Sequence, residues 1–295
     1  MMPALVRAYR AAFSATPGTT DPLAPFGIVS LSTADSEGAA DIGSFRFAQS
    51  ASYFAVPNAA LPNAFLAHAY DLADPWGDAC MPQPMTAQCR GCDAASPDYD
   101  CLTPVYMGPS IHPRLKQPVG ARLAAAALAL AYGKGGAVTG PTLTGCAVVA
   151  GTLRLAFDAA RFGGGALQVR PYDAARRALS GLSVLVNSTD VFGTGAWVGL
   201  NVVLAGAAAV DVDLAPLGGA APQAVKYAWG PTGGPPDTGD VVCCDAATDK
   251  DLCTPGACPL FVSQPLAPFG GLPANPFLAQ IVGGKCVCPE PNVCD

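Results

Sequence analysis

The fold is decided by residues 106–132, which read YMGPSIHPRLKQPVGARLAAAALALAY. Pro113 suits the first position of a helix, because the N–H group that proline lacks would have no intrahelical partner there. The residues from Leu115 to Tyr132 are strong helix formers on an alanine-rich background, and Gly133 supplies a terminator. The sequence therefore predicts a helix over 115–132, and His112 lies on the loop that leads into it.

His112 is one of only two histidines in the chain, the other being His68. An imidazole with a pKa near its reference value of about 6.5 can act as a general base at neutral pH, and catalytic groups are often carried by loops on a rigid scaffold. The alternative is a histidine that only caps the helix or packs against it. His68 falls within an apolar run and is interpreted as a packed strand residue.

Helical and extended patterns alternate upstream of this stretch. The sequence predicts an amphipathic helix over 5–13, a buried strand over 26–31, a helix within 42–60 and a second strand over 64–72. Strands and helices that alternate in this way are typical of an α/β fold with a parallel sheet.

The pattern changes downstream of residue 135. Short runs of β-forming residues are separated there by Gly, Pro and Asp, and they lie at 147–149, 153–157, 184–186, 198–204 and 210–214. Short strands at regular spacing with turn signals between them predict an antiparallel, β-sandwich-like domain over 136–295.

Composition narrows the classes of partner. The chain has 295 residues, of which 51% are hydrophobic and 13% charged, and its formal net charge is −6. Contact with phosphates needs clustered Lys and Arg, which the chain lacks, so we expect no nucleic acid as partner. The longest apolar candidate for a membrane helix, 121–132, is shorter than the roughly 20 residues that a span requires, so we expect no membrane span.

The cysteines point to an oxidising compartment. The chain has 12 of them, and apart from Cys146 they fall into three clusters, at 80–101, 243–258 and 286–294. Clusters of this kind in loop-rich sequence are typical of disulfides in secreted proteins. Asn187 begins an Asn-Ser-Thr glycosylation pattern. Both features predict a secreted or lysosomal glycoprotein, although residues 1–13 lack the apolar core of a signal peptide.

The first cluster has the spacing Cys-x8-Cys-x2-Cys-x8-Cys and consists of Cys80, Cys89, Cys92 and Cys101. Two disulfides that fasten this Pro- and Asp-rich loop are the expected arrangement. Zinc is the alternative, because Cys-x2-Cys is a common half-site for that metal.

Four ordered stretches resemble the sialate O-acetylesterase family, which belongs to the SGNH-type carbohydrate esterases. The stretch 108–117 with Val119 and Arg122-Leu123 is similar to the histidine block of that family. The other three are a Pro-Phe strand with an Arg-x-x-Gln segment (25–29 and 45–50), the piece before the histidine block (56–65 and 71–74), and a closing segment (226–229, 258–260 and 273–277).

The resemblance implies a fold class and a domain organisation. We expect an α/β chain that holds the back half of an SGNH-hydrolase-like parallel sheet with helices, followed by the antiparallel β-sandwich-like domain. The partial esterase domain is expected over 1–135, with a Cys-rich insertion over 75–107, and the β-rich domain over 136–295.

The resemblance also implies roles for particular residues. His112 is expected to be the general base, with Asp74 or Asp71 as the acid that orients it. The alternative is that Asp74 caps a turn and a backbone carbonyl orients the imidazole. Arg46 and Gln49 match the Arg-x-x-Gln segment and are expected to bind substrate, and a buried structural pair is the alternative for both. The substrate is expected to be an acetylated sugar, and no metal or cofactor is expected.

No serine of the chain follows Gly-Gln or lies in a Gly-x-Ser-x-Gly elbow, which are the settings of the serine nucleophile in such enzymes. The chain is therefore expected to be the C-terminal half of an esterase for O-acetyl esters of sialic acid or related sugars. Its expected partner is the missing N-terminal half. The alternative is a catalytically inactive carbohydrate-binding or accessory protein.

Overall fold

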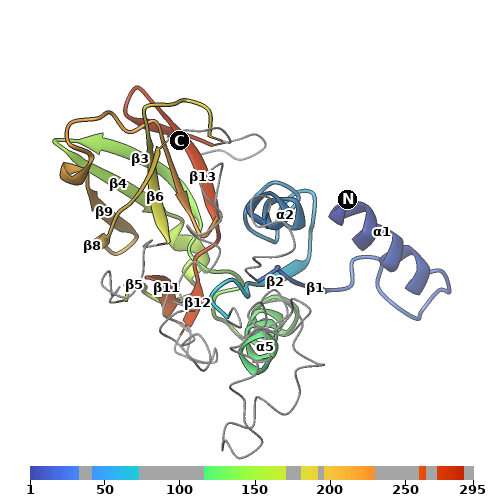
Figure 1. Cartoon of the computed structure of the whole chain (residues 1–295). Coiled ribbons are helices and arrows are strands. Elements are labelled where there is room, and N and C mark those ends of the chain that lie inside the picture. Colours follow the sequence, from blue (N-terminus) through green and yellow to red (C-terminus); the bar gives the residue numbers. More distant parts are fainter. Residues whose placement is uncertain are drawn as a thin grey trace, which may run out of the picture.

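The computed structural model describes residues 1–32, 42–72, 116–170, 181–191, 196–229, 259–263 and 271–288 (Figure 1). Asp74, His112 and the cysteines from Cys80 to Cys101 lie outside the described residues.

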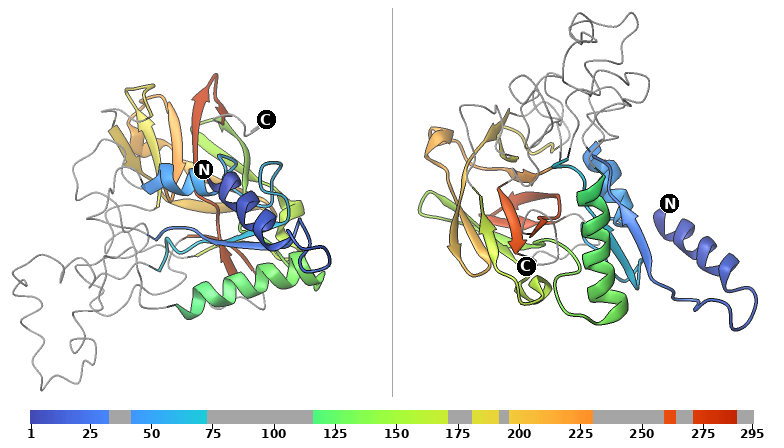
Figure 2. Two further views of the ribbon diagram at one scale, coloured as in Figure 1. Left: turned by 90° about the vertical axis from the view of Figure 1, so that its right-hand side faces the viewer. Right: turned by 90° about the horizontal axis from the view of Figure 1, so that it is seen from below.

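The first part of the chain forms three layers around a small parallel sheet. Strands β1 (Phe26–Val29) and β2 (Ala64–Ala67) pair in parallel with Phe26 opposite Ala64. Helix α5 (Gln117–Tyr132) packs on one face of these strands. Helix α1 (Met2–Phe13) lies on the other side of these strands from α5 (Figure 2), and its Val6 is buried together with Ile28 and Leu66. Both faces of β1 and β2 carry apolar residues that the helices cover, which is typical of parallel strands.

The helices and strands of this region begin near the predicted positions but are mostly shorter. Helix α5 ends at Gly133, which adopts the left-handed conformation of a C-cap with φ 60°. Helix α2 spans only Ile42–Gln49, because Ala51 and Ser52 have φ values of 58° and 68° that cannot continue a helix. The strands end at Val29 and Ala67, and Ser30, the residue after β1, still donates its backbone N–H to Ala67 O.

The second part of the chain is dominated by one antiparallel sheet of nine strands, in the order β7-β6-β10-β13-β14-β3-β4-β9-β8. Its strands are β3 (Leu143–Val149), β4 (Thr152–Phe157), β6 (Leu182–Val186), β7 (Ala196–Gly199), β8 (Val202–Gly206), β9 (Ala209–Asp213), β10 (Ala224–Tyr227), β13 (Phe277–Val282) and β14 (Lys285–Val287). A three-stranded sheet consists of β5 (Leu167–Val169), β11 (Leu260–Ser263) and β12 (Gly271–Pro273). Short 3-10 helices span Ala159–Phe162 and Ala215–Leu217.

The large sheet is strongly curled. Its two edge strands, β7 and β8, are consecutive in the chain, and only Leu200 and Asn201 lie between them. Three steps along the backbone span at most about 11 Å, so the two edges of the sheet must lie close together. The sequence had predicted one strand over 198–204, and this was wrong: Val198 pairs with Val184 on β6, whereas Val202 pairs with Val212 on β9.

The expectation of an α/β chain with an antiparallel β-rich region is confirmed in its coarse form. One feature of the detailed prediction requires correction, and another is not confirmed. The antiparallel region is one curled nine-stranded sheet with a small satellite sheet, and not a sandwich of two similar sheets. The parallel sheet has only two strands within the described residues, which is too few to identify an SGNH sheet.

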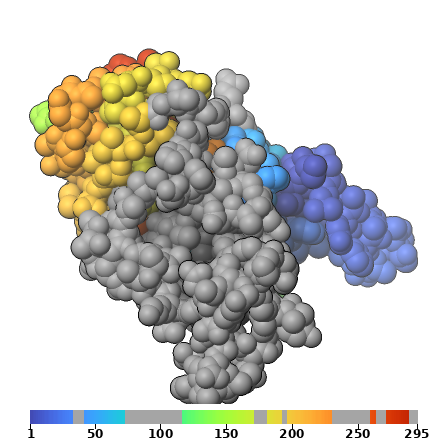
Figure 3. Space-filling view, in the orientation of Figure 1, coloured from blue at the N-terminus to red at the C-terminus, as the bar shows by residue number. Residues whose placement is uncertain are grey.

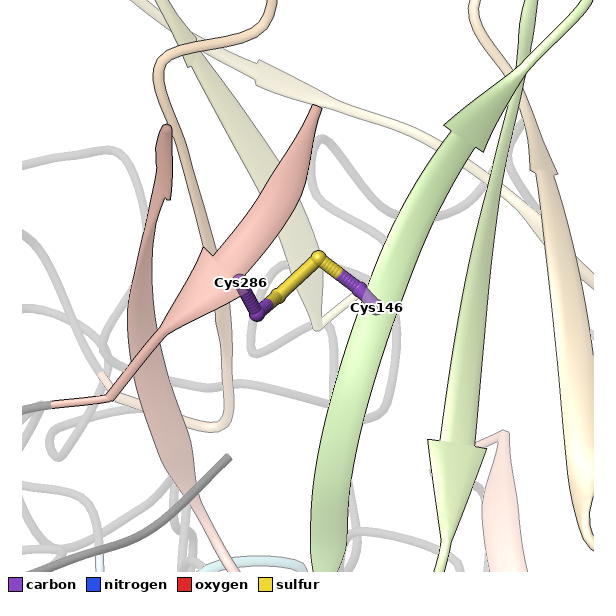
Figure 4. Close-up of a disulfide and its surroundings, with 2 residues drawn as sticks. All are labelled: Cys146 and Cys286. Carbon is purple, nitrogen blue, oxygen red and sulfur yellow. A yellow bond between two sulfur atoms is a disulfide. The ribbon is translucent and has the colours of Figure 1, made fainter. Parts of the chain in front are cut away.

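A disulfide joins Cys146 on β3 to Cys286 on β14 (Figure 4). Lys285 and Ala147 are the only paired residues that these two strands share in the described structure. The disulfide therefore joins the two neighbouring strands with the shortest pairing in the sheet, and we call this boundary the seam. Cys288 is also disulfide-bonded, and no cysteine of the described part is free. The prediction of disulfides is confirmed for Cys146, which had no neighbouring cysteine in the sequence.

Two further expectations concern the surface. Asn187, the candidate glycosylation site, is exposed in a turn after β6. Within the described residues, no helix has the length and apolar character that crossing a bilayer requires.

Candidate functional site

The polar residues of the first part of the chain gather where its two parallel strands end. Ser30 follows β1 directly and His68 follows β2 directly. In open α/β sheets, ligands bind beyond the carboxyl ends of the strands. The candidate site is therefore this carboxyl edge, where the sequence had placed Asp71 and Asp74.

His68 is held between a serine and an asparagine. Ser30 Oγ lies 2.9 Å from His68 Nδ1, and Asn275 Oδ1 lies 2.6 Å from His68 Nε2. The amide of Asn275 donates from Nδ2 to Gly140 O at 3.1 Å, which fixes Oδ1 as the atom that faces the ring. His68 consequently donates its Nε2 proton to Asn275, and Nδ1 accepts the proton of Ser30.

This row of hydrogen-bonded Ser, His and Asn side chains has the order of groups found in hydrolases. Its buried environment, however, is typical of a structural contact between two parts of the protein, which we call the joint. Ser30, His68 and Asn275 are all buried, with exposed fractions of 1%, 4% and 1%. Burial lowers the pKa of His68 to about 4, so the ring is neutral at pH 7 and is a weak base. The chain of hydrogen bonds connects β1 and β2 to the segment between β12 and β13, which fits the expectation that His68 is a packed residue.

Asp71 lies beside this joint in a buried ion pair. Its two carboxylate oxygens accept hydrogen bonds from Arg122 Nη1 at 2.7 Å and Arg122 Nη2 at 2.6 Å. Arg122 Nη1 also donates to the main-chain oxygen of His68 at 2.7 Å. The side chains of Asp71 and Arg122 are 0% and 1% exposed. Arg122 belongs to the second turn of α5, so the ion pair fastens the beginning of that helix to the end of β2.

Tyr70 provides a second link across the same boundary. Its hydroxyl donates to Ala274 O at 2.6 Å, and burial raises its pKa well above the usual value. The neighbouring residues His68 and Tyr70 thus both bind the segment 274–275, which precedes β13.

Arg46 and Gln49, the predicted substrate-binding residues, lie on α2 and contact the backbone that follows β1. Arg46 is buried and donates from Nε to Leu31 O, from Nη2 to Ser32 O and from Nη1 to Ala228 O, at 2.7–2.9 Å. Gln49 accepts from Leu31 N and donates to Val29 O, both at 3.0 Å. These contacts fit the alternative of a structural pair that the sequence had left open.

A cavity of about 270 Å³ lies between α2 and the large antiparallel sheet. The residues that line it are mostly apolar: Ser44, Phe47, Val191, Trp229, Leu278, Gln280, Val287 and Cys288. Helix α2 approaches closely because Gly43 has no side chain, and a Cβ atom at this position would collide with the backbone and ring of Trp229. Phe47 and Trp229, with ring centroids 5.7 Å apart, form an aromatic wall.

In the structure, Asp71, Arg46 and Gln49 all lie near the carboxyl ends of the two parallel strands. The roles of His112 and Asp74 stay predictions. Within the described residues, no group of three or more His, Cys, Asp and Glu side chains could hold a metal ion. Sequence reasoning missed Ser30, Tyr70, Arg122 and Asn275 as parts of the site. Arg122 and Asn275 do fall in two of the stretches that resemble the esterase family, which was the signal available for them.

Comparison with known proteins agrees with the resemblance. The chain is 37% identical over 135 residues to the human sialate O-acetylesterase and 36% identical over 137 residues to the rat (Rattus norvegicus) sialate O-acetylesterase. Each match covers 45% of this chain and 20% of the relative, so the match spans about one fifth of the curated relatives' length. No protein-family model matches the chain.

A solved structure supports the fold. A carbohydrate acetylesterase from Xanthomonas citri superimposes with a TM-score of 0.50 and 23% identity, over 94% of this chain and 44% of that one. The chain therefore resembles the curated sialate O-acetylesterases over 45% of its length, and it shares the fold of a carbohydrate acetylesterase over 94% of its length.

Proposed function

We propose that the chain is part of an enzyme that hydrolyses O-acetyl esters of sialic acid or related sugars. One observation carries this proposal beyond kinship. The contact of Arg122 with Asp71 fastens the first turns of α5 to the carboxyl end of β2. His112 precedes Lys116, the N-cap of α5, by only four residues. This supports a position for the histidine block near the edge of the sheet where an α/β enzyme does its chemistry.

The proposed mechanism is acyl transfer through a serine. The serine oxygen attacks the acetyl carbonyl, and His112 takes the serine proton and returns it to the sugar oxygen as the C–O bond breaks. Water then repeats the attack on the acyl-enzyme and releases acetate. The serine belongs to further strands of an SGNH-type sheet that lie outside this chain, and the sugar is the second partner.

The two carboxylates have different proposed roles. Asp71 is fully engaged with Arg122, so it acts by positioning the start of α5. Asp74 is three residues further on and is the proposed acid that orients His112. Arg46 and Gln49 shape the sugar side of the site by fixing the backbone of residues 29–32.

The proposal is tested with the protein extended by the coding sequence upstream of Met1. This extended protein is expected to release acetate from an O-acetylated sialic acid. His112→Ala should lower kcat by at least about a hundredfold, since general-base catalysis contributes that much or more. His68→Gln is the control and should retain most activity once folded. An equal loss of activity in both variants would refute the role of His112.

A secreted or lysosomal site of action is part of the proposal. The disulfide between Cys146 and Cys286 supports it, because disulfides persist in oxidising compartments. The protein isolated from its own cells is expected to carry a glycan on Asn187, and a glycosidase should reduce its mass. An unmodified Asn187 with reduced cysteines would contradict this assignment.

The cavity beside Trp229 favours one alternative, a catalytically inactive protein that binds carbohydrate. Sugar rings present C–H groups that stack on aromatic faces, and Phe47 and Trp229 provide such a wall. This function predicts binding of an acetylated sugar without turnover, and loss of that binding when Ser44→Trp fills the cavity. Val149→Trp, at an exposed strand position, is the matched control. Turnover by the extended protein would exclude the alternative.

A further inference from the structure

The indole N–H group of Trp229 is buried without a hydrogen-bond partner. Trp229 lies two residues after β10 and is 3% exposed, and its Nε1 atom has no acceptor among the described residues. A buried tryptophan usually donates its N–H to an acceptor, because a buried donor without one lowers the stability of the fold. A ligand that carries an acceptor would satisfy this group.

The unpartnered N–H borders the cavity between α2 and the large sheet. A Cβ atom at Gly43 would lie 2.5 Å from Cδ1 of Trp229, so this edge of the indole faces the first turn of α2. Nε1 is bonded to Cδ1 and belongs to the same edge. Ser44, the next residue of α2, lines the cavity together with Trp229. The donor therefore lies at the cavity wall where α2 begins.

The cavity has a polar rim that is open to solvent. Ser44 of α2 and Gln280 of β13 both line the cavity, and both are exposed. Figure 3 shows that atoms of the segment that includes α2 (light blue) reach the surface next to α1 (dark blue). A small molecule can therefore enter between α2 and β13.

The inner lining favours an apolar ligand over water or a sugar. Phe47, Leu278 and Trp229 form much of this lining, and the amide nitrogen of Gln280 already donates to Thr189 O. A buried water typically makes about three hydrogen bonds, which this lining does not provide. The hydroxyl groups of a sugar ring would also lack partners, and burying them unpaired is unfavourable. The ligand that fits has an apolar body and one acceptor.

We propose that the cavity binds an aromatic carbonyl compound, such as an aryl ester or ketone, whose oxygen accepts the proton of Trp229 Nε1. The ring of the ligand packs against Phe47 and Leu278, and aromatic pairs are more favourable than their buried area alone predicts. The volume of about 270 Å³ lies just below the range of about 300–1,000 Å³ for pockets of drug-sized ligands, so a compound with a single ring fits. Binding in this cavity is independent of the proposed hydrolysis at the carboxyl edge.

The test titrates the 295-residue chain with acetophenone and follows the indole N–H signals of its three tryptophans by NMR. The signal of Trp229 is expected to move downfield, because its proton enters a hydrogen bond. Ethylbenzene has the same ring but no acceptor. It is expected to bind about tenfold more weakly, since the donor stays unpaired in that complex.

Three variants separate the contribution of the N–H group from that of the ring. Trp229→Phe should remove the preference for acetophenone, because phenylalanine keeps an aromatic ring and lacks the donor. Trp197→Phe is the matched control and should keep the preference: Nε1 of Trp197 also lacks a partner among the described residues, but Trp197 does not line the cavity. Ser44→Trp, at an exposed position, should fill the cavity and abolish binding of both compounds without a change in the core.

Three outcomes overturn the proposal: equal affinity of the two compounds for the unmodified chain, a preference for acetophenone that survives Trp229→Phe, or tighter binding of an O-acetylated sialic acid than of acetophenone in the cavity. These measurements involve no turnover. A failure of the proposed esterase to release acetate would therefore leave the binding site intact, and a failure of acetophenone to bind would leave the esterase intact.

Discussion

The Nε2 atom of His68 lies 2.6 Å from Oδ1 of Asn275, a residue 207 positions later in the chain. Replacing Asn275 with alanine would leave the buried Nε2–H of His68 and the oxygen of Gly140 without their partner. We expect the free energy of unfolding to fall by about 2–3 kcal/mol, as for buried polar groups that lose a hydrogen bond. Urea denaturation at pH 7.5 measures this, and the exposed Gln280→Ala is the control. Equal losses in the two variants would show that the contact does not hold the two parts together.

Stability should fall as the pH is lowered from 6.5 to 4. Burial lowers the pKa of His68 from 6.5 to about 4 in the folded state, so the unfolded state binds more protons in this window. The neutral ring of His68 contributes about 3 kcal/mol to the free energy of unfolding. This contribution is fully present above pH 6.5 and is lost as the pH falls toward 4. Urea midpoints at pH 7 and pH 5 report it. His68→Gln should flatten the pH dependence of the free energy of unfolding, whereas His112→Gln should preserve it. The reverse pattern would show that His112, and not His68, causes the pH dependence.

The ion pair of Asp71 and Arg122 should be costly to break from either side. Asp71→Asn or Arg122→Met leaves one buried charge uncompensated, and we expect each to lower the free energy of unfolding by about 3–5 kcal/mol. The double variant should lose much less than the sum. The exposed pair Arg154–Asp211 provides the comparison, and Asp211→Asn should have a far smaller effect. If the double variant lost as much free energy of unfolding as the two single variants together, Asp71 and Arg122 would not be a coupled pair.

Removing the disulfide between Cys146 and Cys286 should weaken the seam between β3 and β14. The two cysteines are 140 residues apart, and we expect the double alanine variant to lose about 2–4 kcal/mol. The single variant Cys146→Ala should also release one titratable thiol, on Cys286, under denaturing conditions. Thiol titration and thermal melting measure both effects. Detection of a free thiol in the unmodified protein at either position would refute the bond.

Local patterns in the sequence predicted the elements that depend on nearby residues. Helix α5 ends at Tyr132 as predicted, because the alanine-rich run and Gly133 act within one segment, whereas Pro118, and not the predicted Pro113, is the proline of its first turn. The parallel pair β1 and β2 was also anticipated. The break between β7 and β8 was missed, because Val198 and Val202 belong to opposite edges of the sheet and no proline or glycine pair marks the change.

The candidate site was predicted less completely than the fold. Asp71, Arg46 and Gln49 were named from the resemblance to the esterase family, but their partners were not predicted. Whether a carboxylate is a catalytic acid or one half of a buried ion pair depends on a contact such as Asp71 with Arg122, which spans 51 residues. Contacts between residues this far apart in the sequence depend on how the chain packs. The periodicity of apolar residues along the sequence does not predict them.

The order of strands in the large sheet has a consequence for biosynthesis. Strands β13 and β14, which span Phe277–Val287, stand in the middle of the sheet between β10 and β3. A nascent chain on the ribosome therefore holds two separate blocks, β7-β6-β10 and β3-β4-β9-β8, each with an unpaired edge until residues 277–287 have been synthesised. Unpaired edges template aggregation. Premature termination near residue 270 would thus leave both blocks without their shared neighbour, and we expect chaperones to be needed until residues 277–287 have been synthesised.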